Sequence, residues 1–186
     1  MSPIERSGSG GGGGGGPTKL FDSTLAAPAA SIDTGVNGVA AGFTALTLYV
    51  IARTVTAAPD EFCGFNFNGD VGTNQAGSEF NNTGVSFSQS GVGAVATAFV
   101  WKFPAATADA NRLGTLTANI PFYASAASSK QMTGDWGYTV FAASNRQIGS
   151  GQVSWLSSAA INQIRFTATS GANFVAGSRM VIYGIT

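Results

Sequence analysis

Hydrophobic and polar residues alternate in short segments along this chain of 186 residues. A period of two is typical of a β-strand, because successive side chains of a strand point to opposite faces. Clusters of Gly, Asn and Ser separate the segments, and no long helical pattern competes with them. The pattern predicts strands at Ala45–Arg53, Phe62–Asn68, Val85–Ser88, Ala94–Phe103, Gly114–Ile120, Thr139–Ala142, Val153–Leu156, Ile161–Thr169 and Arg179–Ile185.

Short strands without intervening helices favour an all-β fold, an antiparallel β-sandwich or jelly-roll-like domain. Two of the predicted strands are apolar on both faces. In Ala45–Arg53, Leu and Val occupy one face while Tyr49 and Ile51 lie on the other, so we expect this strand to be covered on both sides. The last strand is expected to be central or to lie at a subunit interface. Its candidate core or interface residues are Arg179, Met180, Val181, Ile182, Tyr183 and Ile185.

A run of glycines distinguishes the N-terminal region from the rest of the chain. Ordering a glycine backbone costs about 1–2 kcal/mol per residue, and glycine has no side chain with which to recover that cost. If the run is ordered, we expect a neighbouring subunit to hold it. The chain therefore divides into a glycine-rich assembly arm at residues 1–19 and a β-sandwich domain at residues 20–186. The candidate assembly residues are Gly10, Gly11, Gly12, Gly13, Gly14, Gly15, Gly16 and Pro17.

The charge balance bears on the choice of partner. Charged residues make up only 10% of the chain, and nine cations balance nine anions. Nucleic-acid binding depends on clustered Lys and Arg, so we expect no nucleic-acid partner. We find neither a secretory signal nor an apolar stretch long enough to span a bilayer, and we expect a soluble protein without membrane insertion. Cys63 is the only cysteine, which excludes an intrachain disulfide and favours a buried thiol.

Groups suited to catalysis are sparse. The chain has no histidine, which removes the usual proton shuttle at neutral pH and most zinc sites. We therefore expect no enzymatic activity, no cofactor and no metal. Asn66, Asn68 and Asp70 have the spacing of part of a calcium loop, but Asn68-Gly69-Asp70 favours a turn. A glycosidase is the alternative if two acids converge in space from among Asp33, Asp70, Glu79, Asp109 and Asp135.

Tryptophan offers a second route to a binding function. Exposed indole rings could form a platform for a sugar, whereas tryptophans in alternating segments are more often part of a core or an interface. The possible sugar contacts are Trp101, Trp136 and Trp155.

Four segments taken in order carry a resemblance to a known family. They are Ser31–Asp33 (SID), Ile51–Arg53 (IAR), Phe67–Asp70 (FNGD), and Asn173–Arg179 (NFVAGSR) followed by MVIYGI. They resemble a family of small tailed-bacteriophage virion proteins, in which an FNGD-like turn and a terminal GSR…YGI strand recur at similar separations. The resemblance covers about residues 20–186 and leaves the glycine arm outside. The chain differs in having Asn74-Gln75 where Asn-Tyr often follows, and in lacking the usual histidine before the strand at Ala45.

The resemblance implies an all-β, non-enzymatic and oligomeric protein on the exterior of the virion, made in the host cytoplasm. We expect a homotrimer of tail-fibre or tail-tip type that is anchored to other virion proteins by its N-terminal arm. A capsid decoration protein of cement or head-fibre type is an alternative. Another is a carbohydrate-binding adhesin module that contacts a glycan on the host surface.

Overall fold

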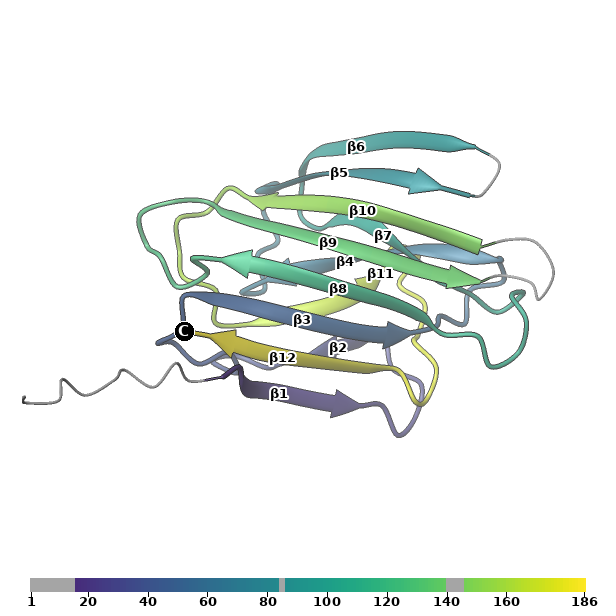
Figure 1. The fold of residues 1–186 in the computed structure, drawn as a ribbon, viewed down its shortest axis with the longest axis horizontal. Coiled ribbons are helices and arrows are strands. Elements are labelled where there is room, and N and C mark those ends of the chain that lie inside the picture. The colour runs from purple at the N-terminus through teal and green to yellow at the C-terminus, as the bar shows by residue number, and fades with distance from the viewer. Residues whose placement is uncertain (1–15, 84–85, 140–145) are drawn as a thin grey trace, which may run out of the picture.

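The computed structural model describes residues 16–83, 86–139 and 146–186. These residues form twelve strands and no helix, arranged in two antiparallel sheets (Figure 1). The larger sheet has eight strands in the order β1 (Thr18–Thr24), β12 (Arg179–Ile185), β3 (Ala45–Ala52), β8 (Gly114–Pro121), β9 (Lys130–Thr139), β10 (Arg146–Trp155), β5 (Gln75–Asn82) and β6 (Phe87–Val95). The smaller sheet has four strands in the order β2 (Ser31–Asp33), β11 (Ile164–Ala168), β4 (Asp60–Phe67) and β7 (Ala98–Pro104).

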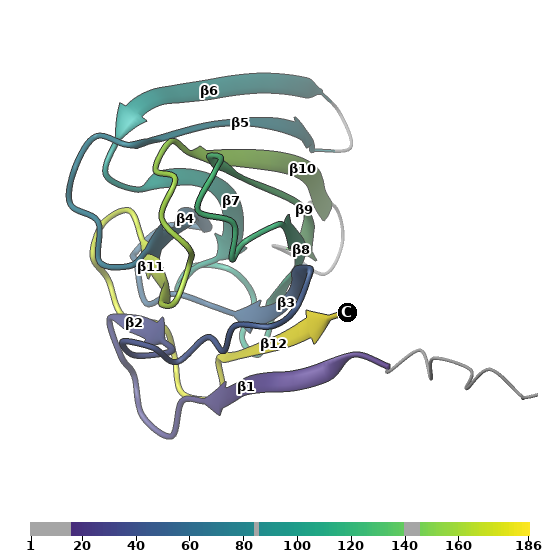
Figure 2. The ribbon, with the colours of Figure 1, turned by 90° about the vertical axis from the view of Figure 1, so that its left-hand side faces the viewer.

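The smaller sheet packs against one face of the larger sheet, which confirms the predicted all-β, sandwich-like fold (Figure 2). Strands far apart in the sequence are neighbours. The C-terminal strand β12 lies between β1 and β3, where Ile182 is opposite Phe21 on one side and Leu48 on the other. The edges of the larger sheet are β1 and β6.

The core lies between the inner faces of the two sheets. Leu48 and Val50 of β3 are fully buried there, as the alternating pattern predicts. The smaller sheet contributes aromatic rings. The ring centroid of Phe166 lies 4.9 Å from that of Phe65 and 5.0 Å from that of Phe174. Burying a side chain of this size contributes about 1.5–3 kcal/mol, so these rings add to the stability of the core.

Some strands of the larger sheet carry glycine on the inner face. Gly149 of β10 is opposite Trp136 of β9, and a Cβ atom at Gly149 would lie 2.5 Å from the Cζ2 atom of that indole. At Gly151, a Cβ atom would lie 3.2 Å from the Nε1 atom of Trp101. The two tryptophans therefore fill the volume that the glycines leave. This packing allows β10, a segment rich in Gly and Ser, to lie between β9 and β5 in the larger sheet.

Several observed strands agree with the predicted segments. The strands β3, β8, β11 and β12 agree to within a few residues, and β4 overlaps its predicted segment almost completely. The strand β12 is an interior strand next to the edge strand β1, because β1 and β3 pair with its two edges. This agrees with the first of the two predicted alternatives, a central strand or a strand at a subunit interface.

Other strands differ from the prediction. The predicted segment Ala94–Phe103 is divided, because β6 ends at Val95 and β7 begins at Ala98. The segment Val153–Leu156 marks only the end of β10. Of Thr139–Ala142, only Thr139 lies among the described residues, where it ends β9, and Val85 also lies outside them. The alternating pattern does not predict β1, β2 or β5, and of β9 it predicts Thr139 alone.

The predicted assembly arm is described only at its end. Gly10–Gly15 lie outside the described residues, whereas Gly16 and Pro17 lie within them. The first strand begins at Thr18, two residues before the domain boundary predicted at residue 20. The sheet therefore begins directly after Pro17.

Candidate functional site

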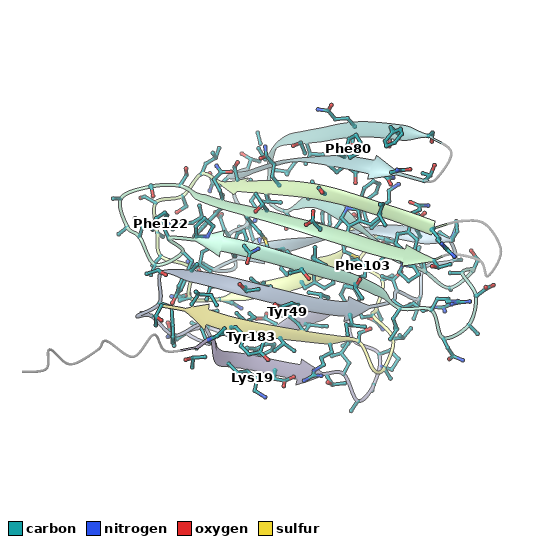
Figure 3. All side chains as sticks on the ribbon, viewed as in Figure 1. Lys19, Tyr49, Phe80, Phe103, Phe122 and Tyr183 are labelled. Atoms are coloured by element: carbon teal, nitrogen blue, oxygen red, sulfur yellow. The ribbon has the colours of Figure 1, made fainter. Side chains whose placement is uncertain are left out.

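The outer face of the larger sheet, turned away from the smaller sheet, carries two open hollows. The first lies over β3 and β12 and is mostly apolar, and we call it the apolar patch. Tyr49 and Tyr183 lie on this face (Figure 3). The patch has a volume of about 420 Å³ and is lined by Pro17, Thr47, Tyr49, Ile51, Arg179, Val181, Tyr183 and Ile185.

The apolar patch corrects the expectation that Ala45–Arg53 is covered on both faces. The inner side chains of β3 are buried, but on the outer face Tyr49 is 46% exposed and Ile51 is 41% exposed. Tyr183 of the neighbouring β12 is only half-buried. The second face is apolar but stays open in a single chain, because the smaller sheet packs against the other side.

The register of β3 and β12 brings the patch residues together. Val181 is opposite Tyr49, and Tyr183 is opposite Thr47. The rings of Tyr49 and Tyr183 meet edge to face with their centroids 6.0 Å apart. Tyrosine combines a large apolar ring with few rotatable bonds, so the pair presents a firm contact surface.

Arg179 is the one charged side chain that lines the apolar patch, and it is paired within the chain. Its Nε and Nη2 atoms donate hydrogen bonds of 2.8 Å to the two carboxylate oxygens of Asp22 on β1. Lys19 donates a further hydrogen bond of 3.0 Å to Asp22. The hydrogen bonds from Arg179 and then Lys19 hold the pKa of Asp22 well below its usual range. Arg179 is therefore paired within its own chain, in a cluster of two cations and one carboxylate.

A second hollow, which we call the polar hollow, lies beside the apolar patch on the same face. It spans β5, β6, β8, β9 and β10 and has a volume of about 610 Å³. The side chain of Thr47 in the apolar patch donates a hydrogen bond of 2.8 Å to Oδ1 of Asn119 in the polar hollow, so the two hollows adjoin. The polar hollow is lined by Ser78, Glu79, Phe80, Gln89, Thr117, Asn119, Thr133, Gly134, Asp135, Ser150, Gly151 and Gln152.

Two features organise the polar hollow. Ser150 of β10 lies opposite Asp135 of β9, and its hydroxyl donates a hydrogen bond of 2.5 Å to the Asp135 carboxylate. On β5, the ring of Phe80 is 49% exposed, and its centroid lies 5.6 Å from that of Phe87 on β6. The sequence analysis considered Asp135 only as a possible glycosidase acid, and it did not predict Phe80 or Ser150 as site residues. The available signal was the alternation of outward polar side chains within β9 and β10.

The three tryptophans are buried, so their assignment as possible sugar contacts is wrong. Trp101 is 0% exposed, Trp136 is 3% exposed and Trp155 is 2% exposed. Trp101 and Trp136 pack beside the inward-facing glycines of β10, while the Nε1 atom of Trp155 donates a hydrogen bond to Asp70. None of the three presents an open ring face on which a sugar could stack.

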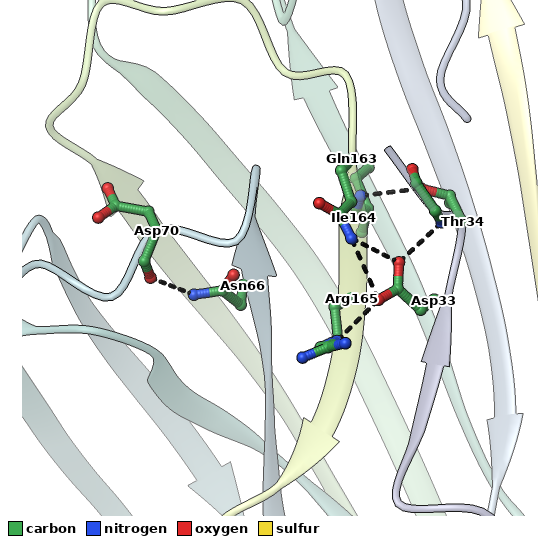
Figure 4. Close-up of polar contacts among 8 residues, drawn as sticks. Asp33, Thr34, Asn66, Asp70, Gln163, Ile164 and Arg165 are labelled. Carbon is green, nitrogen blue, oxygen red and sulfur yellow. Dashed lines mark hydrogen bonds and ion pairs between the residues drawn. The ribbon is translucent and has the colours of Figure 1, made fainter. Parts of the chain in front are cut away.

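The segment from Asn66 to Asp70 forms the predicted turn. Asn68 and Gly69 both have positive φ angles, of 56° and 65°, and the amide of Asp70 donates a 3.0 Å hydrogen bond to the carbonyl of Phe67. Positive φ at both central residues is the geometry that Asn-Gly favours. The side chain of Asn66 donates to the carbonyl of Asp70 (Figure 4). These residues serve a turn, and the calcium-loop alternative has no counterpart in their contacts.

The acids considered for a glycosidase lie in different parts of the fold. Asp33 on β2 accepts a hydrogen bond of 2.7 Å from Nε of Arg165 on β11, which ties the two strands together (Figure 4). Glu79 borders the polar hollow, but its side chain is buried on the inner side of β5, and burial raises its pKa. Asp109 lies in the loop between β7 and β8. Only Asp135 among these four has its side chain on the open outer face of the larger sheet.

Within residues 16–83, 86–139 and 146–186, no three His, Cys, Asp or Glu side chains group together as metal ligands would. The same residues contain no helix with the length and hydrophobicity needed to cross a bilayer.

Comparison of the chain with protein-family models, curated proteins and solved structures gave no match. Cys63 is buried, and burial raises the pKa of its thiol.

Proposed function

We propose that this chain is a non-enzymatic structural protein of a bacteriophage virion, a homotrimer on the exterior of the particle whose subunits associate through the apolar patch. The observation that carries the proposal is the open apolar face of β3 and β12. Tyr49 and Ile51 are nearly half exposed there, and Arg179, the one charged residue of the described lining, is paired within its own chain. Contiguous exposed apolar surface rimmed by polar residues is typical of protein interfaces.

The composition of the apolar patch supports association with protein. Interface cores are enriched in aromatic residues and arginine and depleted of other charged residues. Here Tyr49 and Tyr183 form the centre, and Arg179 contributes a guanidinium that pairs with Asp22. Pro17, the residue next to the glycine run, lines the same patch. The arm and the proposed interface therefore meet at one place on the molecule, which favours their acting together.

The virion part of the proposal rests on the sequence resemblance. Tail-fibre or tail-tip location is the first form of the proposal, and a capsid decoration protein is its alternative. The two differ in the number of copies that a particle carries, because a decoration protein covers the whole shell and a tail part does not. Quantitative gel densitometry of purified particles against the major capsid protein distinguishes them.

The oligomer is tested by replacing Tyr183 with glutamate. Light scattering of the full chain should give three times the 18.8 kDa mass of one chain. Tyr183→Glu should shift the protein to monomer, because association would bury a carboxylate in apolar surroundings. Tyr183→Phe keeps the ring and should keep the trimer.

The matched control is Ile148→Glu. Ile148 is 60% exposed on β10 and lies outside both hollows, so this variant should keep the wild-type mass. A wild-type protein that is monomeric at all concentrations contradicts the proposal. So does a Tyr183→Glu variant that keeps the oligomeric mass.

A further inference from the structure

We infer that the polar hollow is a binding site for a neutral oligosaccharide. The inference does not use the proposed oligomer, because the residues that line the polar hollow are all different from those that line the apolar patch. Its volume of about 610 Å³ falls within the range of roughly 300–1,000 Å³ that is usual for ligand sites.

The lining determines the chemistry of the ligand. Hydroxyl and amide side chains supply both donors and acceptors, and they project from neighbouring strands about 4.8 Å apart. The lining contains no lysine or arginine. A phosphate, a sulfate or a nucleic acid would therefore find no cation, whereas a polyhydroxylated neutral ligand would find hydrogen-bonding partners across the whole surface.

Asp135 is the strongest acceptor on this surface. One of its oxygens already accepts the hydroxyl hydrogen of Ser150, which fixes the orientation of the carboxylate. A carboxylate has acceptor capacity for several hydrogen bonds, so Asp135 can also accept from ligand hydroxyl groups. Hydrogen bonds to an ionised group are stronger than those between neutral groups, and this places Asp135 at the centre of recognition.

Phe80 supplies the apolar element that sugar recognition needs. Its half-exposed ring lies at the β5 side of the hollow, with Phe87 next to it. The face of an aromatic ring carries partial negative charge and attracts the C–H groups on the apolar face of a pyranose. A carboxylate, a set of amides and hydroxyls, and a phenyl ring thus converge on one open hollow.

A protein partner fits this hollow less well than a sugar does. Serine and aspartate are depleted from protein interfaces, yet they line the polar hollow. The adjoining apolar patch has the opposite composition, with two tyrosines and aliphatic side chains. The two hollows therefore differ in chemistry on one continuous face, and only the apolar one has the composition of an interface.

The test is a binding screen of the full chain on an array of neutral oligosaccharides with sulfated dextran oligosaccharides as charged probes, followed by calorimetric titration of the best neutral binder. We expect binding to at least one neutral oligosaccharide. Asp135→Ala and Phe80→Ala should each weaken it by about tenfold, the size expected when a hydrogen bond to a charged group or a stacked ring is lost. Phe80→Tyr keeps the ring and should keep the affinity.

The chain offers a matched control in Gln131→Ala. Gln131 accepts a 2.8 Å hydrogen bond from Ser154 across the same two strands that carry the Asp135–Ser150 pair, but neither residue lines the hollow. This variant should bind like wild type. Circular dichroism confirms that each variant is folded.

The inference is overturned if no neutral oligosaccharide binds or if only the sulfated probes bind. It is also overturned if a neutral oligosaccharide binds with affinity that Asp135→Ala and Phe80→Ala leave unchanged. Because affinity is measured per chain, these outcomes do not depend on the oligomeric state that light scattering reports.

Discussion

Two neighbouring residues of β12 face opposite surroundings. Ile182 is fully buried between the sheets, while Tyr183 lies on the outer face of the sheet in the apolar patch. Substitutions at these adjacent positions should therefore have separable effects. A change at Ile182 should alter folding, and a change at Tyr183 should alter association.

Ile182→Asp should abolish soluble folded protein, because it places an uncompensated charge in the core. The conservative variant Ile182→Val should fold, with a loss of about 0.5–1.5 kcal/mol in the free energy of unfolding. Soluble yield and thermal unfolding monitored by circular dichroism measure both effects. A soluble Ile182→Asp variant with the wild-type mass by light scattering would show that the assignment of this face is wrong.

Asp70 links the turn after β4 to Trp155 at the end of β10. Hydrogen bonds from the Trp155 indole at 2.8 Å and from Asn74 at 2.9 Å lower the pKa of Asp70 below its usual value of 3.8. A carboxylate with a lowered pKa in the folded state adds stability above its unfolded pKa, and that contribution is lost as the pH falls through the folded value.

Asp70→Asn should therefore be less stable than wild type at pH 7, and the difference should shrink as the pH falls below about 3.8, the usual value for this group. Urea unfolding of both proteins from pH 7 to pH 2 measures the difference. A constant difference across that range would mean that the ionised carboxylate has no role of its own.

At the scale of elements, Thr18 and Lys19 are the described residues of the predicted arm that belong to the sheet. The first strand begins at Thr18 and pairs with β12, so deletion of residues 1–15 removes no described strand. The truncated chain should keep the wild-type melting temperature but fail to join the particle, because a glycine run can be ordered only through contacts outside itself. Purified particles assembled with the truncated chain can be tested by immunoblotting. Incorporation of the truncated chain at the wild-type level would contradict the assembly role of the arm.

A strand could be predicted from the sequence when its own side chains supply the apolar groups that pack on its inner face. The strands β3 and β12 carry their own Leu, Val and Ile on the inner face, so the alternation showed them directly. The strand β10 carries Gly149 and Gly151 at inner positions, where rings from β9 and β7 supply the apolar volume. A pattern read along one strand cannot show packing that a neighbouring strand provides.

The same reasoning applies to the candidate site. Tyr49 and Tyr183 were visible as apolar residues on a second face, but the sequence could not tell whether the chain itself covers that face. The polar hollow was not predicted, because the alternating pattern does not reveal β5, which carries Phe80, and Ser150 lies between Gly149 and Gly151 in the glycine-rich part of β10. The three tryptophans were predicted as possible sugar contacts, but their large side chains are buried in the core.

At the scale of the whole molecule, one sheet carries both proposed activities. Its inner face holds the fold together, and its outer face is divided between an apolar half over β3 and β12 and a polar half over β5, β6 and β8–β10. The low charge content suits this arrangement, since the formal net charge is zero and only 10% of residues are charged. Association and recognition then depend on shape, hydrogen bonds and apolar contact.

An interface made from the apolar patch responds to temperature differently from one built on ion pairs. Burial of apolar surface is driven by entropy near room temperature and weakens on cooling. Added salt acts mainly on exposed charges, and the one charged side chain of the patch, Arg179, is already paired with Asp22 in its own chain. The assembly would therefore loosen in the cold and remain intact across a wide range of ionic strength.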